Sequence, residues 1–162
     1  MSTADYIVSR VMIGLVILEF FADNQMWRYQ TAKRQYQKSA QVPKGCGFTR
    51  AQLDRGFITT GLWSYSRHPN FAAEQAIWVF LYIWGCVASQ TYLNWTACGV
   101  VTYLGVFAGS TPLTEWITSK KYSDYKVYQK RVGRFIPNFF GKGWTEEEMN
   151  MRAQMKANSA KR

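Results

Sequence analysis

The stretch from Thr60 to Glu74 holds the densest group of side chains that could do chemistry. Within it, Arg67 and His68 directly precede Pro69, which biases His68 toward an extended backbone and favours a helix start. A helix N-terminus presents free N–H groups to an anion, and a guanidinium beside it adds a charged donor. This arrangement suits a phosphate group. Alternatively, both side chains only reach from a helix end toward water at a membrane surface.

Three carboxylates accompany this stretch. Glu74 lies one turn inside an otherwise uncharged apolar segment, where an ionised group is costly and needs a partner. That partner is either a polar ligand or a basic residue of another helix. Glu19 and Asp23 are four residues apart and therefore share one helix face. They could hold a cation or a ligand hydroxyl, or form only a polar helix edge.

A third group combines phenols with cations near the C-terminus. Tyr122, Tyr125 and Tyr128 alternate with lysines and arginines between residues 121 and 134. Phenol and ammonium donors together suit phosphate groups. The same composition is also typical of a helix that lies on anionic lipid headgroups.

Several other chemistries are excluded by what the sequence lacks. It has no glycine-rich loop after a strand and no phosphate-loop lysine motif. A single histidine argues against a zinc site or a serine triad. The three cysteines are widely spaced, so they form neither a disulfide framework nor a paired-cysteine metal site.

The distribution of charge identifies the elements that must position these groups. The 162 residues carry a net charge of +10, yet residues 71–109 contain no lysine or arginine. Basic blocks that alternate with apolar stretches are typical of a multi-pass membrane protein. No recognition motif accompanies the charge, so we expect no nucleic-acid partner.

We therefore predict an all-α polytopic membrane protein with about three transmembrane helices, together with interfacial and C-terminal cytosolic helices. The spans are expected at about 6–22, 71–88 and 93–108. The first is short and contains Arg10 and Glu19, but it lacks the small-residue cleavage site of a signal peptide. We expect it to continue as an interfacial helix to Lys38, before the break at Pro43–Gly47.

The short uncharged link at 89–92 makes the second and third spans an antiparallel hairpin. By the charge rule, the N-terminus and this link are non-cytosolic, and both basic blocks and the C-terminus are cytosolic. The small residues at Gly105 and Gly109 predict a close helix approach. Thr111 and Pro112 predict a new helix start. We expect a membrane domain over 1–144 and a charged, helical tail over 145–162.

Three stretches carry a resemblance to a known family. They are "LEFFADNQMWRY", "TGLWSYSRHPNFAAE" and "STPLTEWITSKKYSDYKVYQKRVGRFIP". Their order and spacing over residues 15–140 resemble the C-terminal half of the steroid 5-alpha-reductase-like superfamily of membrane enzymes, in particular its uncharacterised branch. Sterol C14 reductases and isoprenylcysteine carboxyl methyltransferases share the Arg-His-Pro core more distantly.

The resemblance implies a helical membrane fold that binds NADPH from the cytosolic side and reduces a carbon–carbon double bond of a lipid or sterol-like substrate. It assigns the cofactor to Arg67, His68, Asn70 and Glu74, with Tyr122 and Tyr125 in the segment that closes over it. It also implies the endoplasmic reticulum. An S-adenosylmethionine-dependent methyltransferase and a non-catalytic membrane subunit are the alternatives. Superfamily members are usually longer, so we expect a shortened member, or a partner membrane chain or homo-oligomer that completes the lipid pocket.

Overall fold

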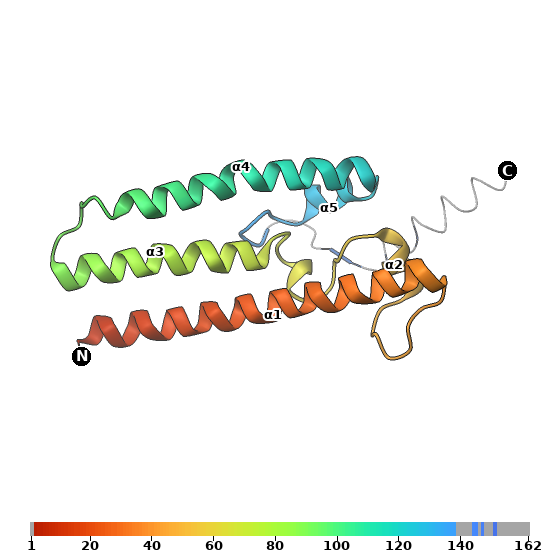
Figure 1. The fold of residues 1–162 in the computed structure, drawn as a ribbon, viewed down its shortest axis with the longest axis horizontal. Helices are drawn as coiled ribbons and strands as arrows, with labels where there is room; N and C mark the ends of the chain where they lie inside the picture. Colours follow the sequence, from red (N-terminus) through yellow and green to blue (C-terminus); the bar gives the residue numbers. More distant parts are fainter. Residues whose placement is uncertain (1, 139–143, 146, 148–150, 152–162) are drawn as a thin grey trace.

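A computed structural model describes residues 2–138, 144, 145, 147 and 151. These residues form helices and loops and contain no extended sheet, in agreement with the predicted all-α class. The elements are α1 (Thr3–Ser39), α2 (Arg50–Arg55), the 3-10 turn η1 (Gly61–Ser64), α3 (Pro69–Ser89), α4 (Ala97–Lys121) and α5 (Tyr125–Arg131). The three long helices lie side by side, and the short elements gather at one end of them (Figure 1).

Helix α1 confirms that the first apolar stretch and the polar segment after it form one continuous helix. It begins with a capping box, in which the Ser2 and Asp5 side chains each bind the other residue's backbone N–H. It ends where Ala40 adopts the left-handed conformation, before the predicted break at Pro43. The helix therefore reaches from one end of the molecule to the other (Figure 1).

Helix α3 begins as predicted at the Arg-His-Pro sequence. His68 is its N-cap residue and Pro69 occupies the first helical turn, where its missing N–H leaves no hydrogen bond unmade. The helix ends at Ser89, one residue after the predicted span. The following link leads to α4, which runs antiparallel to α3 (Figure 1).

The predicted helix start at Thr111–Pro112 is wrong. Helix α4 runs without interruption from Ala97 through Pro112 to Lys121, and so extends well beyond the predicted span at 93–108. Thr111 and Glu115 are both buried and four residues apart, on one face of α4. Packing of this face holds the helix together, while the exposed ring of Pro112 lies on its outside.

Two of the described helices, α3 and α4, are long and apolar enough to cross a membrane. Little of their most apolar surface is buried within the chain, which is unlike the core helix of a soluble protein. Among the described residues, the close helix approach predicted at Gly105 and Gly109 is absent, because a Cβ atom at either position would meet nothing within 4 Å.

Long-range contacts set the relative position of α1 and α3. At one end Trp84 Nε1 donates to Asp5 Oδ1 at 2.8 Å, and at the other Asn70 Nδ2 donates to Asp23 Oδ1 at 2.9 Å. The two helices are therefore antiparallel, with the N-terminus beside the α3–α4 link (Figure 1). The N-terminus and the α3–α4 link thus lie at the same end of the long helices, while their side of a membrane stays a prediction.

Two clusters of buried residues fill the end of the molecule where the short elements lie. One consists of Phe57, Tyr125, Tyr128, Val132 and Trp144. The other joins α1 to the loop around η1 and consists of Tyr29, Ala32, Leu53, Ile58 and Trp63. These clusters hold the connecting segments against the helix ends. Most of the predicted tail, residues 145–162, lies outside the described residues.

Candidate functional site

Glu115 is the centre of a buried ionic network. Its carboxylate binds Arg67 through two contacts, from Nε to Oε1 at 2.6 Å and from Nη2 to Oε2 at 3.2 Å. His68 Nε2 lies 3.1 Å from Oε1, and Arg134 Nε lies 3.5 Å from Oε2. Arg67, His68 and Glu115 are all buried. The interpretation that Arg67 and His68 only extend into water is therefore wrong.

The Nη1 group of Arg67 binds the backbone at the C-terminal end of α5. Nη1 donates to the carbonyl oxygens of Gln129 at 2.8 Å and Val132 at 2.5 Å. The Arg67 guanidinium thus links three parts of the chain, which are the segment before α3, helix α4 and the end of α5. Since a buried charge is tolerated only when it is paired and hydrogen-bonded, this network holds the three segments in one geometry.

Backbone pairing strengthens the same junction. The N–H of Arg67 donates to the Gly133 carbonyl at 2.9 Å, and the N–H of His68 donates to the Arg134 carbonyl at 3.0 Å. A side chain at Gly133 would collide with the Ile136 carbonyl oxygen, because its Cβ would lie 1.9 Å away. Glycine at this position therefore allows the chain to fold back beside the Arg-His-Pro turn.

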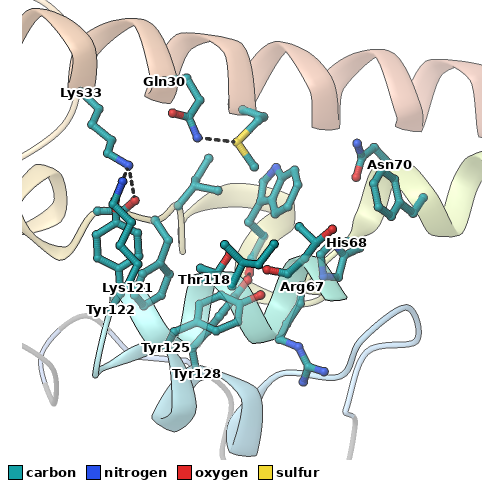
Figure 2. A pocket seen from close by; sticks show the side chains of 18 residues that line it. Gln30, Lys33, Arg67, His68, Asn70, Thr118, Lys121, Tyr122, Tyr125 and Tyr128 are labelled. Carbon is teal, nitrogen blue, oxygen red and sulfur yellow. Dashed lines mark hydrogen bonds between the residues drawn. The ribbon is translucent and has the colours of Figure 1, made fainter. Parts of the chain in front are cut away.

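A second polar contact lies across from this network. The buried Lys33 on α1 donates from Nζ to the Gly56 carbonyl at 2.5 Å and to the Tyr122 hydroxyl at 2.9 Å (Figure 2). Gly56 has a φ of 85°, and a Cβ there would lie 2.1 Å from Cε1 of Tyr122. Only glycine permits both this backbone conformation and this contact with the ring.

The charges around Tyr122 alter its acidity. Burial alone would raise the pKa of the Tyr122 phenol, but the ammonium groups of Lys33 and Lys121 outweigh burial and lower the pKa below its usual value. Tyr125 differs, since burial and then the Glu115 charge raise its pKa. The Tyr122 hydroxyl thus lies in a field that favours negative charge, as a phosphate group would require.

Between the Glu115 network and the Lys33–Tyr122 contact lies a cavity of about 380 Å³ (Figure 2). Its volume is within the range of about 300–1,000 Å³ that is common for small-molecule sites. Cations, phenols and amides share the wall with apolar side chains. The lining residues are Met26, Gln30, Lys33, Gly56, Phe57, Ile58, Trp63, Arg67, His68, Asn70, Phe71, Thr114, Ile117, Thr118, Lys121, Tyr122, Tyr125 and Tyr128.

Five of the six predicted site residues line this cavity: Arg67, His68, Asn70, Tyr122 and Tyr125. Tyr125 and Tyr128 are buried in an aromatic cluster, so the interpretation of this segment as a helix on lipid headgroups is wrong for these two side chains. Asn70 donates to Asp23, but its buried Oδ1 atom has no hydrogen-bond partner among the residues that the structure describes. A buried acceptor without a donor is uncommon and suits a ligand N–H group.

Glu74 is the predicted site residue that does not line the cavity. Its Oε1 atom accepts a hydrogen bond from Trp78 Nε1 at 2.9 Å and from the Tyr103 hydroxyl at 2.5 Å. The carboxyl group of Glu19, on α1, is close enough to interact with it. The predicted alternative, an ion pair with a basic residue of another helix, is absent from the described part of the chain.

Sequence reasoning did not identify Glu115 or Lys33 as site residues. Lys33 belongs to a polar stretch in which several charged residues look equivalent. The available signal for Glu115 was its position as the single acid of α4, opposite an Arg-His pair that needs a counter-charge. Lys33 had no comparable signal, because its burial depends on Gly56 and Tyr122, which are distant in sequence.

Comparisons with known proteins place these residues in a family. Residues 1–132 match the model of a family described as "Protein of unknown function (DUF1295)". An uncharacterised protein of Schizosaccharomyces pombe is 44% identical over 140 residues, which is 86% of this chain and 41% of that protein. The chain therefore spans about two-fifths of the length of this curated relative. No solved structure matches the chain.

Proposed function

This chain belongs to the DUF1295 family, and we propose that it is a membrane-embedded reductase of the steroid 5-alpha-reductase-like superfamily. In this proposal NADPH supplies a hydride to a carbon–carbon double bond of a lipid or sterol-like substrate. The observation that carries the proposal is the cavity that joins the Arg-His-Pro turn to Lys33, Lys121 and Tyr122. In this proposal the cations of the cavity bind the phosphates of the cofactor, and its apolar walls pack against a ring of the cofactor.

The position of the cavity along the helices supports this function. We propose α1 as a third span, because the helical rise puts about 32 Å between its exposed aromatic residues Tyr6 and Trp27, close to the ~30 Å hydrocarbon core of a bilayer. Met26, Gln30 and Lys33 line the cavity. The cavity therefore lies near the end of the proposed α1 span that is marked by Trp27. A site at this depth is accessible to a charged nucleotide from the cytosol and to a lipid from the bilayer.

Individual side chains suit separate parts of the cofactor. The ammonium groups of Lys33 and Lys121 suit its phosphates, with the Tyr122 hydroxyl between them. The unpartnered Oδ1 atom of Asn70 suits an amide N–H group. Arg67 has its donors engaged by Glu115 and by backbone carbonyls, so its proposed role is to position the turn that bears His68 and Asn70.

The proposal also covers location and assembly. The basic residues of α1 beyond Trp27 and those of α4 and α5 lie toward the same end of the long helices (Figure 1). This supports the proposal that this end and the C-terminus are cytosolic. We propose an intracellular membrane, such as the endoplasmic reticulum. Because little of α3 and α4 is buried within the described part of the chain, we propose that a partner membrane chain or a second copy packs on them and contributes to the lipid pocket.

Thermal unfolding of the detergent-purified chain tests the proposed function. NADPH at about 100 times its dissociation constant should stabilise the fold by about 2.7 kcal/mol and raise the unfolding midpoint. The Lys121→Met variant should lose most of this increase. Lys120→Met is the matched control, because the ammonium group of Lys120 lies 3.7 Å from the centre of the Trp116 ring and does not line the cavity.

The other ligands separate the alternatives. Stabilisation by S-adenosylmethionine in place of NADPH would overturn the reductase proposal in favour of a methyltransferase. Stabilisation by neither cofactor, together with a stoichiometric partner after native purification, would indicate a non-catalytic subunit. An equal response of Lys121→Met and Lys120→Met to NADPH would place the phosphates elsewhere.

A further inference from the structure

Trp144 packs behind the wall of the cavity at the Arg-His-Pro turn. Its side chain is buried, and its ring contacts the rings of Tyr128 and Phe57 at centroid distances of 5.1 and 6.4 Å. Tyr128 and Phe57 both line the cavity, whereas Trp144 does not. Trp144 is therefore in contact with two side chains of the wall from the side that faces away from the cavity.

The same ring contacts the chain on both sides of Gly56. The guanidinium carbon of Arg55 lies 5.2 Å from the centre of the Trp144 ring, which is a cation–π contact. Phe57 follows Gly56 directly and packs on the same ring. Since the Gly56 carbonyl accepts a hydrogen bond from Lys33 Nζ, its position depends on how these two neighbours are held.

Phe57 also connects this contact to the phenols of the cavity. Its ring lies 5.0 Å from the ring of Tyr125 and 6.1 Å from that of Tyr122. The Tyr122 hydroxyl is the second acceptor of Lys33 Nζ. Both acceptors of this buried ammonium group thus belong to parts of the wall that Phe57 contacts or adjoins. A buried charge keeps its place only while its partners keep theirs.

The contact joins segments that are distant in the sequence. Phe57 precedes η1, Tyr128 lies in α5, and Trp144 lies beyond α5 and outside residues 1–132, which match the family model. Aromatic side chains supply large contact areas with a fixed ring geometry. One indole ring can therefore hold the segment at 55–57 against α5.

We propose that Trp144 is a positioning residue of the cavity, whose ring holds residues 55–57 in the place that fixes the Lys33 ammonium group. This inference deepens the proposed function and rests on it for the identity of the ligand, NADPH. Without the indole ring, the Gly56 carbonyl can move away from Lys33, and the ammonium group loses its fixed position in the wall.

The accessibility of Lys33 in the full chain tests this role without nucleotide. A brief pulse of acetic anhydride on the detergent-purified protein should modify the exposed Lys38 much faster than the buried Lys33, as measured by peptide mass spectrometry. Trp144→Leu keeps an apolar side chain but removes the ring contacts. It should raise the rate at Lys33 relative to Lys38 about tenfold, which corresponds to about 1.4 kcal/mol. An unchanged ratio would overturn the proposal.

Three comparisons separate positioning from a general loosening of the fold. Trp144→Phe retains a ring and should restore most of the protection of Lys33. Trp116→Leu makes the same change at an exposed tryptophan outside the cavity lining and should leave the ratio unchanged. The buried Cys86, on α3, should stay unreactive toward a thiol reagent in each variant. Exposure of Cys86 together with Lys33 in Trp144→Leu would overturn the assignment, because Trp144 would then hold the whole fold.

Nucleotide binding separates this inference from the proposed function. The dissociation constant of NADPH should rise about tenfold in Trp144→Leu and stay nearly unchanged in Trp144→Phe and Trp116→Leu. Equal NADPH affinity in Trp144→Leu and the unmodified chain would overturn the positioning role. If no variant and not even the unmodified chain binds NADPH, while Lys33 is still released in Trp144→Leu, the proposed function fails and the positioning role of Trp144 stands.

Discussion

At the scale of single residues, Glu115 determines whether the candidate site can form. Its carboxylate faces Arg67, His68 and Arg134, and the first two are buried with it. Pairing offsets the large cost of removing these charges from water only while every partner is present. Loss of this one carboxylate leaves an uncompensated buried guanidinium.

We predict that Glu115→Gln lowers the free energy of unfolding by about 3–5 kcal/mol, the usual cost of breaking a buried ion pair from one side. Denaturant or thermal unfolding in detergent measures this loss. Asp54→Asn is the control, because Asp54 pairs with Arg50 at 3.8 Å on an exposed surface. This substitution should lower the free energy of unfolding by less than about 1 kcal/mol. A loss below about 1 kcal/mol in Glu115→Gln would show that the Glu115 network contributes little.

The sequence was sufficient to group Arg67, His68 and Asn70, because they are adjacent and their types are distinctive. It was also sufficient to add Tyr122 and Tyr125 through the resemblance, and these five residues line one cavity. Glu115 could not be predicted in the same way. Its role depends on contacts with side chains 47 and 48 residues away, which no local pattern encodes.

At the scale of elements, the packing of α1 on α3 positions the Arg-His-Pro turn. Ala22 on α1 and Ala73 on α3 are almost completely buried, with exposed fractions of 0% and 1%. The Trp63 indole N–H donates to the carbonyl oxygen of Ala22 at 3.2 Å, which attaches η1 to the same part of α1. Small side chains in this region allow the helices and the turn to approach one another.

Ala73→Leu should lower the free energy of unfolding by about 1–3 kcal/mol, since added methylene groups in a packed contact force side chains and backbone to move. The same change at the exposed position Ala88, on the same helix, should have little effect. Thermal unfolding of both variants checks the difference. An unchanged free energy of unfolding in Ala73→Leu would mean that α1 and α3 can move apart at this contact without loss of stability.

Helix boundaries were predicted well where a local signal decides them and poorly where packing does. Pro69 opens α3 as expected, because proline suits a first turn. Pro112 gives the same local signal, yet α4 continues through it. The difference is that Thr111 and Glu115 are buried on one face of α4, and this tertiary packing outweighs the local preference of proline.

At the scale of the whole molecule, the two ends of the long helices differ in the segments that they carry. The N-terminus and the α3–α4 link lie at one end, and α2, α5 and the Lys33–Lys121 pair lie at the other (Figure 1). Charge and hydropathy predicted that the N-terminus and the link lie on one side of a membrane, and this topology stays a prediction. They did not predict the cavity, which requires three sequence-distant segments to meet.

Membrane topology gives a direct test of this polarity. In a chain whose native cysteines are replaced by alanine, Lys38→Cys should react with a membrane-impermeant thiol reagent from the cytosolic side of sealed vesicles. Leu93→Cys, which replaces a side chain with an exposed fraction of 92%, should react only from the opposite side. Labelling of both positions from one side would show that α3 does not cross the membrane.

The backbone pairing of Arg67 and His68 with Gly133 and Arg134 also has a consequence for biosynthesis. A ribosome makes the Arg-His-Pro turn long before it makes Glu115, the α5 carbonyls and the strand-like segment that follow. Throughout that interval the nascent chain carries the Arg67 guanidinium and the His68 imidazole without their final partners. The turn therefore reaches its native state only when nearly the whole chain has emerged, so a truncated product retains the long helices but lacks a finished site.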